Sequence, residues 1–181
     1  MAIRIERLAS HHQRGEFDCG EPLLNDFLQR QAGQLERRGF GKTYVALAED
    51  GLVVLGFVTL SAGQMQTQQL PQQLKLPRHP APIVRIGRLG VNQAQQGRGL
   101  GQQLMSFALQ VALEFSQQVG IYAVVVNAKD LKAKAFYTAL GFSESLDDSL
   151  CMYLPLSVLT KARSPLQGKA TPLALGQTKP H

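Results

Sequence analysis

Charged side chains, cysteines and long apolar runs are all scarce in this chain of 181 residues. Charged residues make up 18% of the sequence. This is below the usual share of about a quarter and argues against a disordered acidic chain or a coiled coil. The two cysteines, Cys19 and Cys151, provide neither a disulfide framework nor the spacing of metal ligands. We therefore expect no metal site and no disulfide-bonded, secreted fold.

Apolar stretches are too short for a membrane protein. The longest, Leu52–Leu60, is interrupted by Gly56, whereas a helix that spans a bilayer needs about 20 apolar residues. The first residues, MAIRIERLAS, lack the apolar core of a signal peptide. These two features predict a cytoplasmic protein with no membrane partner.

The net charge of +6 is unevenly distributed. Residues 161–181 contain no acid and carry four of these charges, on Lys161, Arg163, Lys169 and Lys179. Their Pro, Gly, Ser and Thr content is typical of disordered segments. We therefore expect one domain over residues 1–160 and a basic, disordered tail over 161–181. The basicity of the whole chain is then weak evidence for a nucleic-acid partner.

Periodicity predicts a mixed sheet with helices on its faces, which is an α+β (α/β mixed sheet) fold. Apolar alternation or continuous apolar runs predict strands at Ile3–Leu8, Lys42–Ala48, Leu52–Leu60, Ile83–Val91, Ile121–Val126 and Asp148–Leu154. Apolar residues at helical spacing predict helices at Glu21–Leu35, Gly99–Gln118 and Lys129–Leu140. Gln64–Pro82 has no periodicity and is expected to form a long loop. His11 and His12 are expected on the surface.

The most informative stretch is Leu89–Gly101, where a strand ends and a long helix begins. The turn between them contains three alternating glycines, Gly97, Gly99 and Gly101. Bare backbone N–H groups and the positive end of a helix dipole together bind anions. A flexible strand–helix turn would explain one or two of these glycines, but not three in register with a helix start. The stretch therefore predicts a pyrophosphate site.

Three phosphate-binding signatures compete for this turn. A dinucleotide-binding fingerprint needs a later third glycine and an acid about 20 residues further on. Gly41-Lys42-Thr43 matches the end of a P-loop, but Glu36 replaces the first glycine and the segment runs from helix to strand. The third signature fits. Gln96–Gly101 resembles the Gln/Arg-x-x-Gly-x-Gly/Ala motif of the GNAT N-acetyltransferases, which bind acetyl-CoA there, and the order of elements agrees over Ile3–Leu156.

The GNAT resemblance implies a V-shaped sheet whose fourth and fifth strands are splayed by a bulge, with the pantetheine arm of acetyl-CoA between them. Gly87 and Gly90 could each supply the bulge or allow close packing of another backbone. Backbone groups of Leu89 and Val91 would pair with pantetheine, and the Val91 N–H would polarise the thioester carbonyl. Asn127 could bind pantetheine or only end a strand. The implied cofactor residues are Leu89, Gly90, Val91, Gln96, Gly97, Arg98, Gly99, Leu100, Gly101, Gln102 and Asn127.

Tyr137 is the expected catalytic acid, because GNAT enzymes commonly place a tyrosine there near the thioester sulfur. A phenol of pKa about 10 can protonate a thiolate whose thiol titrates near about 8.5. The alternative is that Tyr137 only packs beside Phe136.

No catalytic base is evident: residues 82–93 contain no Asp, Glu or His, although Glu36, Glu49 or a chain of waters could serve. At pH 7 about 17% of an α-amine but only about 0.04% of a lysine amine is uncharged, so the site suits an α-amine acceptor better.

Further motifs resemble one branch of the GNAT family, the type II toxins that acetylate aminoacyl-tRNA, block translation and are neutralised by a ribbon-helix-helix antitoxin. These motifs are Phe17-Asp18-Cys19-Gly20 with Leu24, Phe27 and Leu28, then Thr43-Tyr44-Val45, Gly87–Val91, Ala135-Phe136-Tyr137 and Gly141-Phe142. The basic tail departs from the branch. Toxins of this branch are often dimers, so the resemblance leaves a homodimer open, while the sequence itself does not indicate the oligomeric state.

Basic side chains along the chain are the expected tRNA contacts. They are Arg37, Arg38, Lys42, Arg85, Arg88 and Lys132. Arg85 and Arg88 are three residues apart on a predicted strand, a spacing that puts them on opposite faces of a regular strand. For any one of these residues the alternative is simple solubility or compensation of a helix C-terminus.

The sequence therefore predicts an acetyl-CoA-dependent N-acetyltransferase that acts on the α-amino group of aminoacyl-tRNA. Two alternatives stay open at this point. One is a GNAT enzyme that acetylates a small amine or a protein N-terminus, and the other is a non-catalytic acyl-CoA-binding module.

Overall fold

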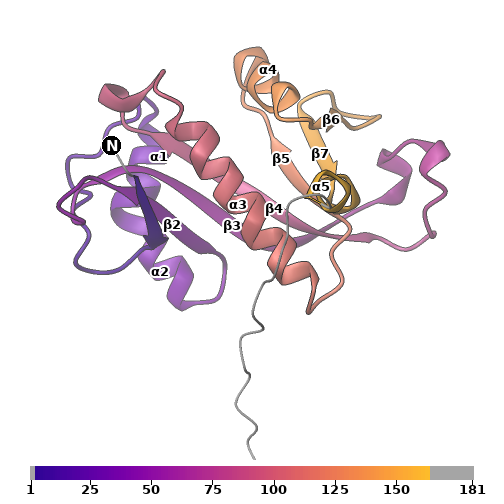
Figure 1. Cartoon of the computed structure of the whole chain (residues 1–181), viewed down its shortest axis with the longest axis horizontal. Coiled ribbons are helices and arrows are strands. Elements are labelled where there is room, and N and C mark those ends of the chain that lie inside the picture. The colour runs from indigo at the N-terminus through magenta and orange to yellow at the C-terminus, as the bar shows by residue number, and fades with distance from the viewer. Residues whose placement is uncertain (1–2, 164–181) are drawn as a thin grey trace, which may run out of the picture.

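The computed structural model describes residues 3–163, and a seven-stranded mixed sheet runs through them (Figure 1). The strands lie in the order β1-β2-β3-β4-β5-β7-β6. Within this part of the chain β4 and β5 pair in parallel, and every other neighbouring pair is antiparallel. The strands are β1 (Arg4–Arg7), β2 (Lys42–Leu47), β3 (Val54–Met65), β4 (Ala81–Val91), β5 (Ala123–Asn127), β6 (Ser143–Glu144) and β7 (Cys151–Pro155).

Helices cover both faces of the sheet (Figure 1). They are α1 (Pro22–Asp26), the π-helical segment η1 (Phe27–Gln31), α2 (Ala32–Arg37), α3 (Leu100–Ser116), α4 (Leu131–Ala139) and α5 (Leu156–Arg163). One face packs α3, α4 and α5 around a core that includes Val58, Leu104 and Met152. The other face packs α1, η1 and α2 on Val45 and Phe57. The expected α+β mixed-sheet fold is confirmed.

A bulge in β4 opens the sheet. In the pairing of β3 with β4, Leu60 lies opposite Ile86 and Thr59 lies opposite Arg88, so Gly87 is the extra residue. The pairing of β4 with β5 ends at Ile86 and Val126. β4 then continues as Gly87–Val91 with no described strand on its β5 side. We call this place, bounded by Gly87–Val91 and the end of β5, the strand opening.

The expected helix over residues 21–35 is present but is interrupted by a π-turn. The Ala32 N–H bonds to the Phe27 carbonyl, five residues earlier. This is the i→i+5 hydrogen bond of a π-turn, and Phe27, Leu28 and Ala32 around it are all buried. Helical periodicity predicts the element but not this local change, because the extra residue is stabilised by packing against the sheet.

Several boundaries differ from expectation. β3 extends to Met65, so the long loop is shorter and includes the turns η2 (Thr67–Gln69) and η3 (Gln72–Leu74). β6, two residues long, is too short for a periodic signal, and α5 was not predicted. Residues 161–163 continue α5, while residues 164–181, the rest of the expected tail, lie outside the described residues. No helix within 3–163 has the length and apolar character needed to cross a membrane.

Candidate active site

The strand opening exposes backbone N–H groups on one edge of β4. The Asn92 N–H donates to the Leu55 carbonyl on β3 at 2.8 Å. Because successive backbone groups point to alternate sides of a strand, the N–H groups of Val91 and Leu89 point away from β3. The Val91 carbonyl, on that same side, accepts a hydrogen bond from Gln96 Nε2 at 2.9 Å. The Val91 N–H therefore faces the opening, as the family resemblance requires of the group that polarises the thioester.

Gly87 and Gly90 have different roles in β4. Gly87 is the bulged residue, and a Cβ placed on it would have no atom within 4 Å. A Cβ on Gly90 would lie 2.8 Å from Phe57 Cε1, a separation that real Cβ atoms do not adopt. Gly90 is thus required by close packing of an aromatic ring. The expected bulge thus lies at Gly87, whereas the close packing expected of another backbone is made instead by the Phe57 ring against Gly90.

The glycine turn has the conformation that anion binding needs. Gly97 and Gly99 have φ of 77° and 83°, in the left-handed region that favours glycine. Gly99 is the N-cap residue of α3 and makes no side-chain cap bond. The first N–H groups of a helix have no partner inside the helix, so they are available to an anion alongside the helix dipole. These features fit a diphosphate.

The remaining residues of the turn divide between core and surface. The Leu100 side chain is buried in the core beneath α3, so only its backbone can serve a ligand. A Cβ on Gly101 would lie 3.6 Å from Phe136 of α4, an ordinary van der Waals separation. Arg98 and Gln102 are exposed beside the turn.

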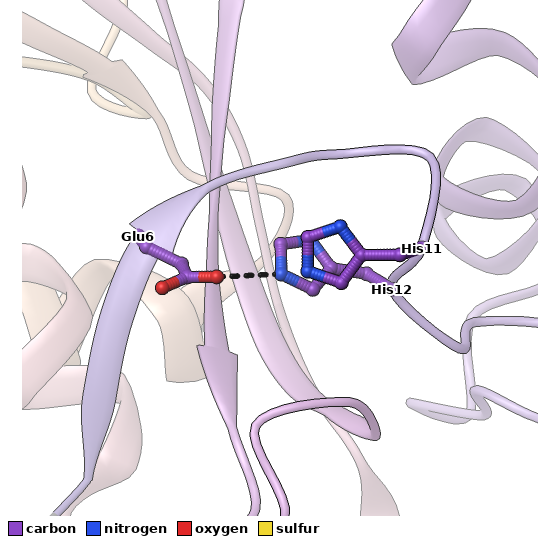
Figure 2. Close-up of side chains that lie close together, drawn as sticks. All are labelled: Glu6, His11 and His12. Carbon is purple, nitrogen blue, oxygen red and sulfur yellow. Dashed lines mark hydrogen bonds and ion pairs between the residues drawn. The ribbon is translucent and has the colours of Figure 1, made fainter.

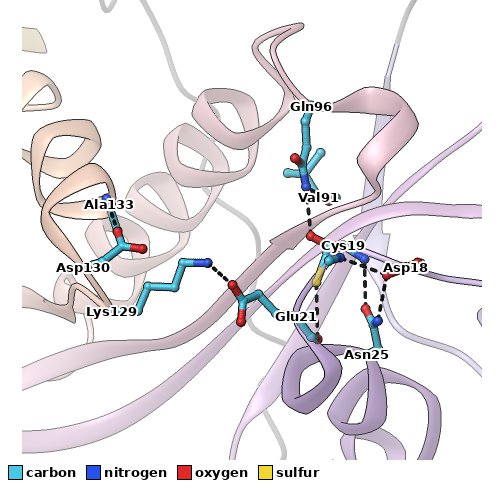
Figure 3. A network of polar contacts seen from close by, with 10 residues as sticks. Asp18, Cys19, Glu21, Asn25, Val91, Gln96, Lys129, Asp130 and Ala133 are labelled. Carbon is cyan, nitrogen blue, oxygen red and sulfur yellow. Dashed lines mark hydrogen bonds and ion pairs between the residues drawn. The ribbon is translucent and has the colours of Figure 1, made fainter.

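The segment Asp18-Cys19, which precedes α1, is hydrogen-bonded to the glycine turn and to the residues just before it (Figure 3). We call it the bracing segment. The Gln96 side chain donates from Nε2 to the carbonyls of both Val91, at 2.9 Å, and Cys19, at 3.0 Å. The Gln93 N–H donates to the Asp18 carbonyl at 2.9 Å. Gln96 was expected to contribute its backbone to cofactor binding. The structure shows that its side chain ties the turn to the end of β4.

The bracing segment is itself held by the Asp18 carboxylate. Asp18 Oδ1 accepts hydrogen bonds from the Gly20 N–H at 2.9 Å and from Asn25 Nδ2 at 3.0 Å (Figure 3). These bonds lower the pKa of Asp18. Burial raises the pKa of the Cys19 thiol, which agrees with a packing role for that cysteine. The Asp-x-Gly spacing is the sequence signal that could have predicted this turn.

The Tyr137 side chain combines a packed ring with a free hydroxyl. Its ring lies edge-on to Phe136 at 5.3 Å and to Phe142 at 5.8 Å. Within residues 3–163 its hydroxyl bonds to no protein group. Burial raises the pKa of Tyr137, so the phenol stays protonated at neutral pH and can donate a proton.

Arg85 and Arg88 lie on the same face of the sheet, so the expectation of opposite faces is wrong. Arg85 is opposite Ser61 and Arg88 is opposite Thr59, and residues two apart on β3 share a face. The bulge at Gly87 inserts the residue that reverses the alternation. Both arginines therefore lie on the face that carries α1 and α2.

Each of these arginines already has a partner across the site. Arg85 Nη1 donates to Asn127 Oδ1 at 2.5 Å and so links β4 to the end of β5. The Arg88 guanidinium lies 3.9 Å from the centre of the Phe27 ring, a cation–π contact that holds it against η1. Asn127 thus binds Arg85 through its oxygen, and its expected contact with pantetheine stays a prediction.

The other expected tRNA contacts lie in two separate places. Arg37, Arg38 and Lys42 surround the turn from α2 to β2, where Arg38 lies over the Phe40 ring at 5.3 Å. Lys132 is exposed on α4, beyond β5. The structure therefore does not gather all six basic residues into one cluster. It divides them between the end of α2, the strand opening and α4.

The carboxylates that could act as a base are not equivalent. Glu36 lies 2.6 Å from Arg7 Nη2 and 3.9 Å from Lys42 Nζ, so it is committed to these cations. Glu49 is exposed in the β2–β3 turn. Glu21, which sequence reasoning did not single out, lies beside the strand opening and pairs with Lys129 at 2.6 Å.

Glu6, His11 and His12 lie close enough together to resemble a metal site (Figure 2). His12 is 4% exposed, so its expected surface position is wrong. Its Nδ1 accepts the Ala9 N–H at 2.9 Å, and its Nε2 lies 2.8 Å from Glu6 Oε1. Because Nδ1 is the acceptor, Nε2 carries the ring proton and donates to Glu6. Both ring nitrogens are therefore already used, which does not fit a metal ligand.

A separate apolar cavity of about 490 Å³ lies beneath the C-terminal half of α3. Tyr44, Leu60, Val84 and Phe115 are among its walls. It includes neither the glycine turn nor Tyr137, so it is distinct from the strand opening.

Comparisons with known proteins agree with this geometry. Residues 39–144 match the model of the acetyltransferase (GNAT) domain. The tRNA-acetylating toxin of Mycobacterium tuberculosis is 33% identical over 140 residues, which cover 76% of this chain and 82% of that protein.

Two solved structures are similar over most of the chain. AtaT complexed with acetyl-methionyl-tRNAfMet has a TM-score of 0.84 at 29% identity and covers 89% of this chain and 99% of its own. A mutant of AtaT bound to the C-terminus of the antitoxin AtaR and acetyl-CoA has a TM-score of 0.78 at 27% identity and covers 88% and 97%. The chain belongs to the GNAT acetyltransferase family and is related to the tRNA-acetylating toxins of toxin–antitoxin systems.

Proposed function

We propose that this N-acetyltransferase transfers the acetyl group of acetyl-CoA to the α-amino group of an aminoacyl-tRNA and so blocks translation, as the toxin of a type II toxin–antitoxin pair. The observation that carries the proposal is the meeting of two sets of backbone donors. The Val91 N–H faces the strand opening, and Gln96 joins that residue to the glycine turn that begins α3. Acetyl-CoA is then the donor substrate.

Different backbone groups would bind different parts of acetyl-CoA. N–H groups of residues 96–101 would bind the diphosphate, and backbone groups of Leu89 and Val91 would pair with the pantetheine arm. The Val91 N–H would stabilise the negative charge that develops on the thioester oxygen, as backbone donors do in oxyanion holes. Tyr137 would protonate the departing thiolate, since its raised pKa keeps the proton on the phenol.

The choice of acceptor rests on the charge of the site. Arg88 and Arg85 share the face that carries α1 and α2, and Arg37, Arg38 and Lys42 border that face at the end of α2. Cations in these positions suit the phosphates of a tRNA acceptor stem. An α-amine also needs less help to lose its proton than a lysine amine does, and β4 carries no carboxylate.

An in vitro translation assay with and without acetyl-CoA tests this function, followed by mass spectrometry of the charged tRNA pool. We expect inhibition only with acetyl-CoA, together with N-acetylated aminoacyl-tRNA. Arg88→Glu should lower tRNA acetylation while calorimetry still finds acetyl-CoA binding. Acetylation of polyamines or lysine peptides in preference to charged tRNA would contradict the proposal.

The protein partner is part of the same proposal. AtaT has been solved with the C-terminus of its antitoxin AtaR, and we expect a ribbon-helix-helix antitoxin here, encoded next to this chain. Co-expression should restore growth that the chain alone stops. We also expect a homodimer, which size-exclusion chromatography with light scattering would detect. Because charged tRNA is cytoplasmic, the proposal places the enzyme in the cytoplasm.

A further inference from the structure

An ion pair connects the two sides of the strand opening (Figure 3). Lys129 follows β5, Glu21 precedes α1, and Lys129 Nζ lies 2.6 Å from Glu21 Oε1 although the residues are 108 apart in the chain. Figure 3 shows the two side chains pointing toward each other from opposite sides. The pair therefore links the segment after β5 to the segment before α1 across the opening.

Backbone contacts join Glu21 to the end of β4 that carries Val91. Cys19 Sγ contacts the Glu21 carbonyl at 3.8 Å, and the Cys19 carbonyl accepts from the Gln96 side chain. The same Gln96 nitrogen donates to Val91. Three consecutive contacts thus connect the backbone of Glu21 to that of Val91, whose N–H would polarise the thioester.

Neither side chain of the pair is needed by the local fold. Glu21 is the N-cap residue of α1 but makes no side-chain cap bond. The side chains are 48% and 55% exposed, and exposed pairs of this kind contribute little to stability. The fold therefore does not explain why a carboxylate is held at this place.

Glu21 also differs from the other acids around the site. Asp18 accepts bonds from Gly20 and Asn25, and Asp130 accepts from the Ala133 N–H at the start of α4. Within the described residues the Glu21 carboxylate bonds only to the Lys129 ammonium. That ammonium has the chemistry of the proposed substrate, which is also a primary amine.

We propose that Glu21 is the binding site for the α-ammonium group of the acceptor, and that Lys129 occupies this site in the free protein. The inference rests on the proposed function and names the residue that holds its amine substrate. The hydrogen bond from Lys129 to Glu21 raises the pKa of that lysine, so it stays charged at neutral pH and competes with the acceptor.

The chemistry that follows balances. Glu21 takes one proton from the bound ammonium, which frees the nitrogen lone pair. The nitrogen bonds to the acetyl carbonyl carbon, and the carbon–sulfur bond breaks. Tyr137 gives its proton to the thiolate and regains the second proton that the nitrogen loses. Glu21 then releases its proton to water, so the products are one amide, one thiol and one proton.

Steady-state kinetics with two acceptors test this assignment. One is an aminoacyl-tRNA, and the other is an amino-acid methyl ester, which has the α-ammonium group but no phosphate. Glu21→Gln should lower kcat/KM about 10- to 100-fold for both, the loss expected of a charge-assisted hydrogen bond. Lys129→Met should lower KM about two- to fivefold for both, because an exposed competitor is removed. In the Glu21→Gln background, Lys129→Met should have no effect on KM.

Matched controls separate this role from general charge. Glu16→Gln removes another exposed glutamate before α1, and Lys161→Met removes a distant exposed lysine; both should leave kinetics unchanged. Calorimetry with acetyl-CoA should give wild-type affinity for every variant, which shows that each is folded.

Two results would overturn the assignment while the proposed function stands. In the first, Glu21→Gln leaves kcat/KM unchanged on both acceptors. In the second, Lys129→Met raises KM for tRNA and leaves the ester unaffected, which would make Lys129 a phosphate contact. Acetylation of the ester but not of tRNA would refute the tRNA function and leave the Glu21 assignment intact. If the wild-type protein acetylates neither acceptor, both fail.

Discussion

Replacement of Gly90 by alanine should push apart β4 and the aromatic core beneath it. The new Cβ would lie 2.8 Å from Phe57 Cε1 and 3.4 Å from Phe57 Cδ1. Phe57 cannot move aside easily, because it is 0% exposed and its ring packs against Phe17 at 5.6 Å and Phe27 at 6.0 Å. The β4 backbone must therefore shift, and with it the neighbouring N–H of Val91.

The magnitude follows from two opposing effects. Overpacking of a core typically costs about 1–3 kcal/mol. Alanine also lowers the conformational entropy of the unfolded chain, which stabilises the folded state by about 0.4–1 kcal/mol. We therefore expect Gly90→Ala to lose about 1–2 kcal/mol of unfolding free energy. Gly87→Ala, on the same strand, has no atom within 4 Å of the new Cβ and no left-handed φ, so it should be neutral or slightly stabilising.

Urea denaturation followed by circular dichroism measures both variants, since the chain has no tryptophan for fluorescence. Calorimetry should show weaker acetyl-CoA binding for Gly90→Ala, because Val91 moves. Phe57→Leu makes room for the methyl group. The Gly90→Ala/Phe57→Leu double variant should therefore lose less unfolding free energy than the two single variants lose together, by at least about 0.5 kcal/mol. Equal losses at Gly87 and Gly90, or strict additivity with Phe57→Leu, would refute the reasoning.

Three further perturbations have distinct signatures. Tyr137→Phe keeps the packed ring but removes the acid, so kcat should fall by about 10²-fold or more while calorimetric acetyl-CoA affinity is retained; an unchanged kcat would exclude the role. His12→Ala leaves the Ala9 N–H unpaired and should lower the urea-unfolding free energy by about 1–3 kcal/mol, whereas His11→Ala, at an exposed position, should not. The lowered pKa of Asp18 stabilises the fold above the ordinary value of about 3.9, and this contribution is lost as pH falls below it. Asp18→Asn should therefore be less stable than wild type at pH 7, with a difference that narrows in urea titrations below about pH 4; a constant difference would count against this account.

Local patterns predicted most of the fold. Helical spacing located the main helices, and apolar alternation or continuous apolar runs located the main strands, because strands such as β5 are buried on both faces. The misses have physical causes. β6 is two residues long, the π-turn depends on packing of Phe27 and Ala32 against the sheet, and α5 is held by Leu156 and Leu159 against a core built from distant strands.

The sequence likewise predicted some features of the candidate site and missed others. The sequence placed the glycine turn at the start of α3, since the glycines and the first helical residues follow one another directly in the chain. It did not place Gln96 as a brace, because the carbonyl of Cys19 that it binds is 77 residues away. It also predicted that Arg85 and Arg88 lie on opposite faces. That prediction was wrong because side chains alternate between faces only where the strand has no bulged residue.

By itself, then, the amino-acid order indicated the family and located the glycine turn, because each of the motifs involved is short and local in the chain, whereas the catalytic role of Tyr137 stays a prediction. The tertiary structure decided which face the arginines share, which glycine bulges and which packs, and that Glu21 meets Lys129 across the opening. These features depend on pairing register and on contacts between segments far apart in the chain. A periodic pattern carries no information about such contacts, because they form only when the whole sheet is assembled.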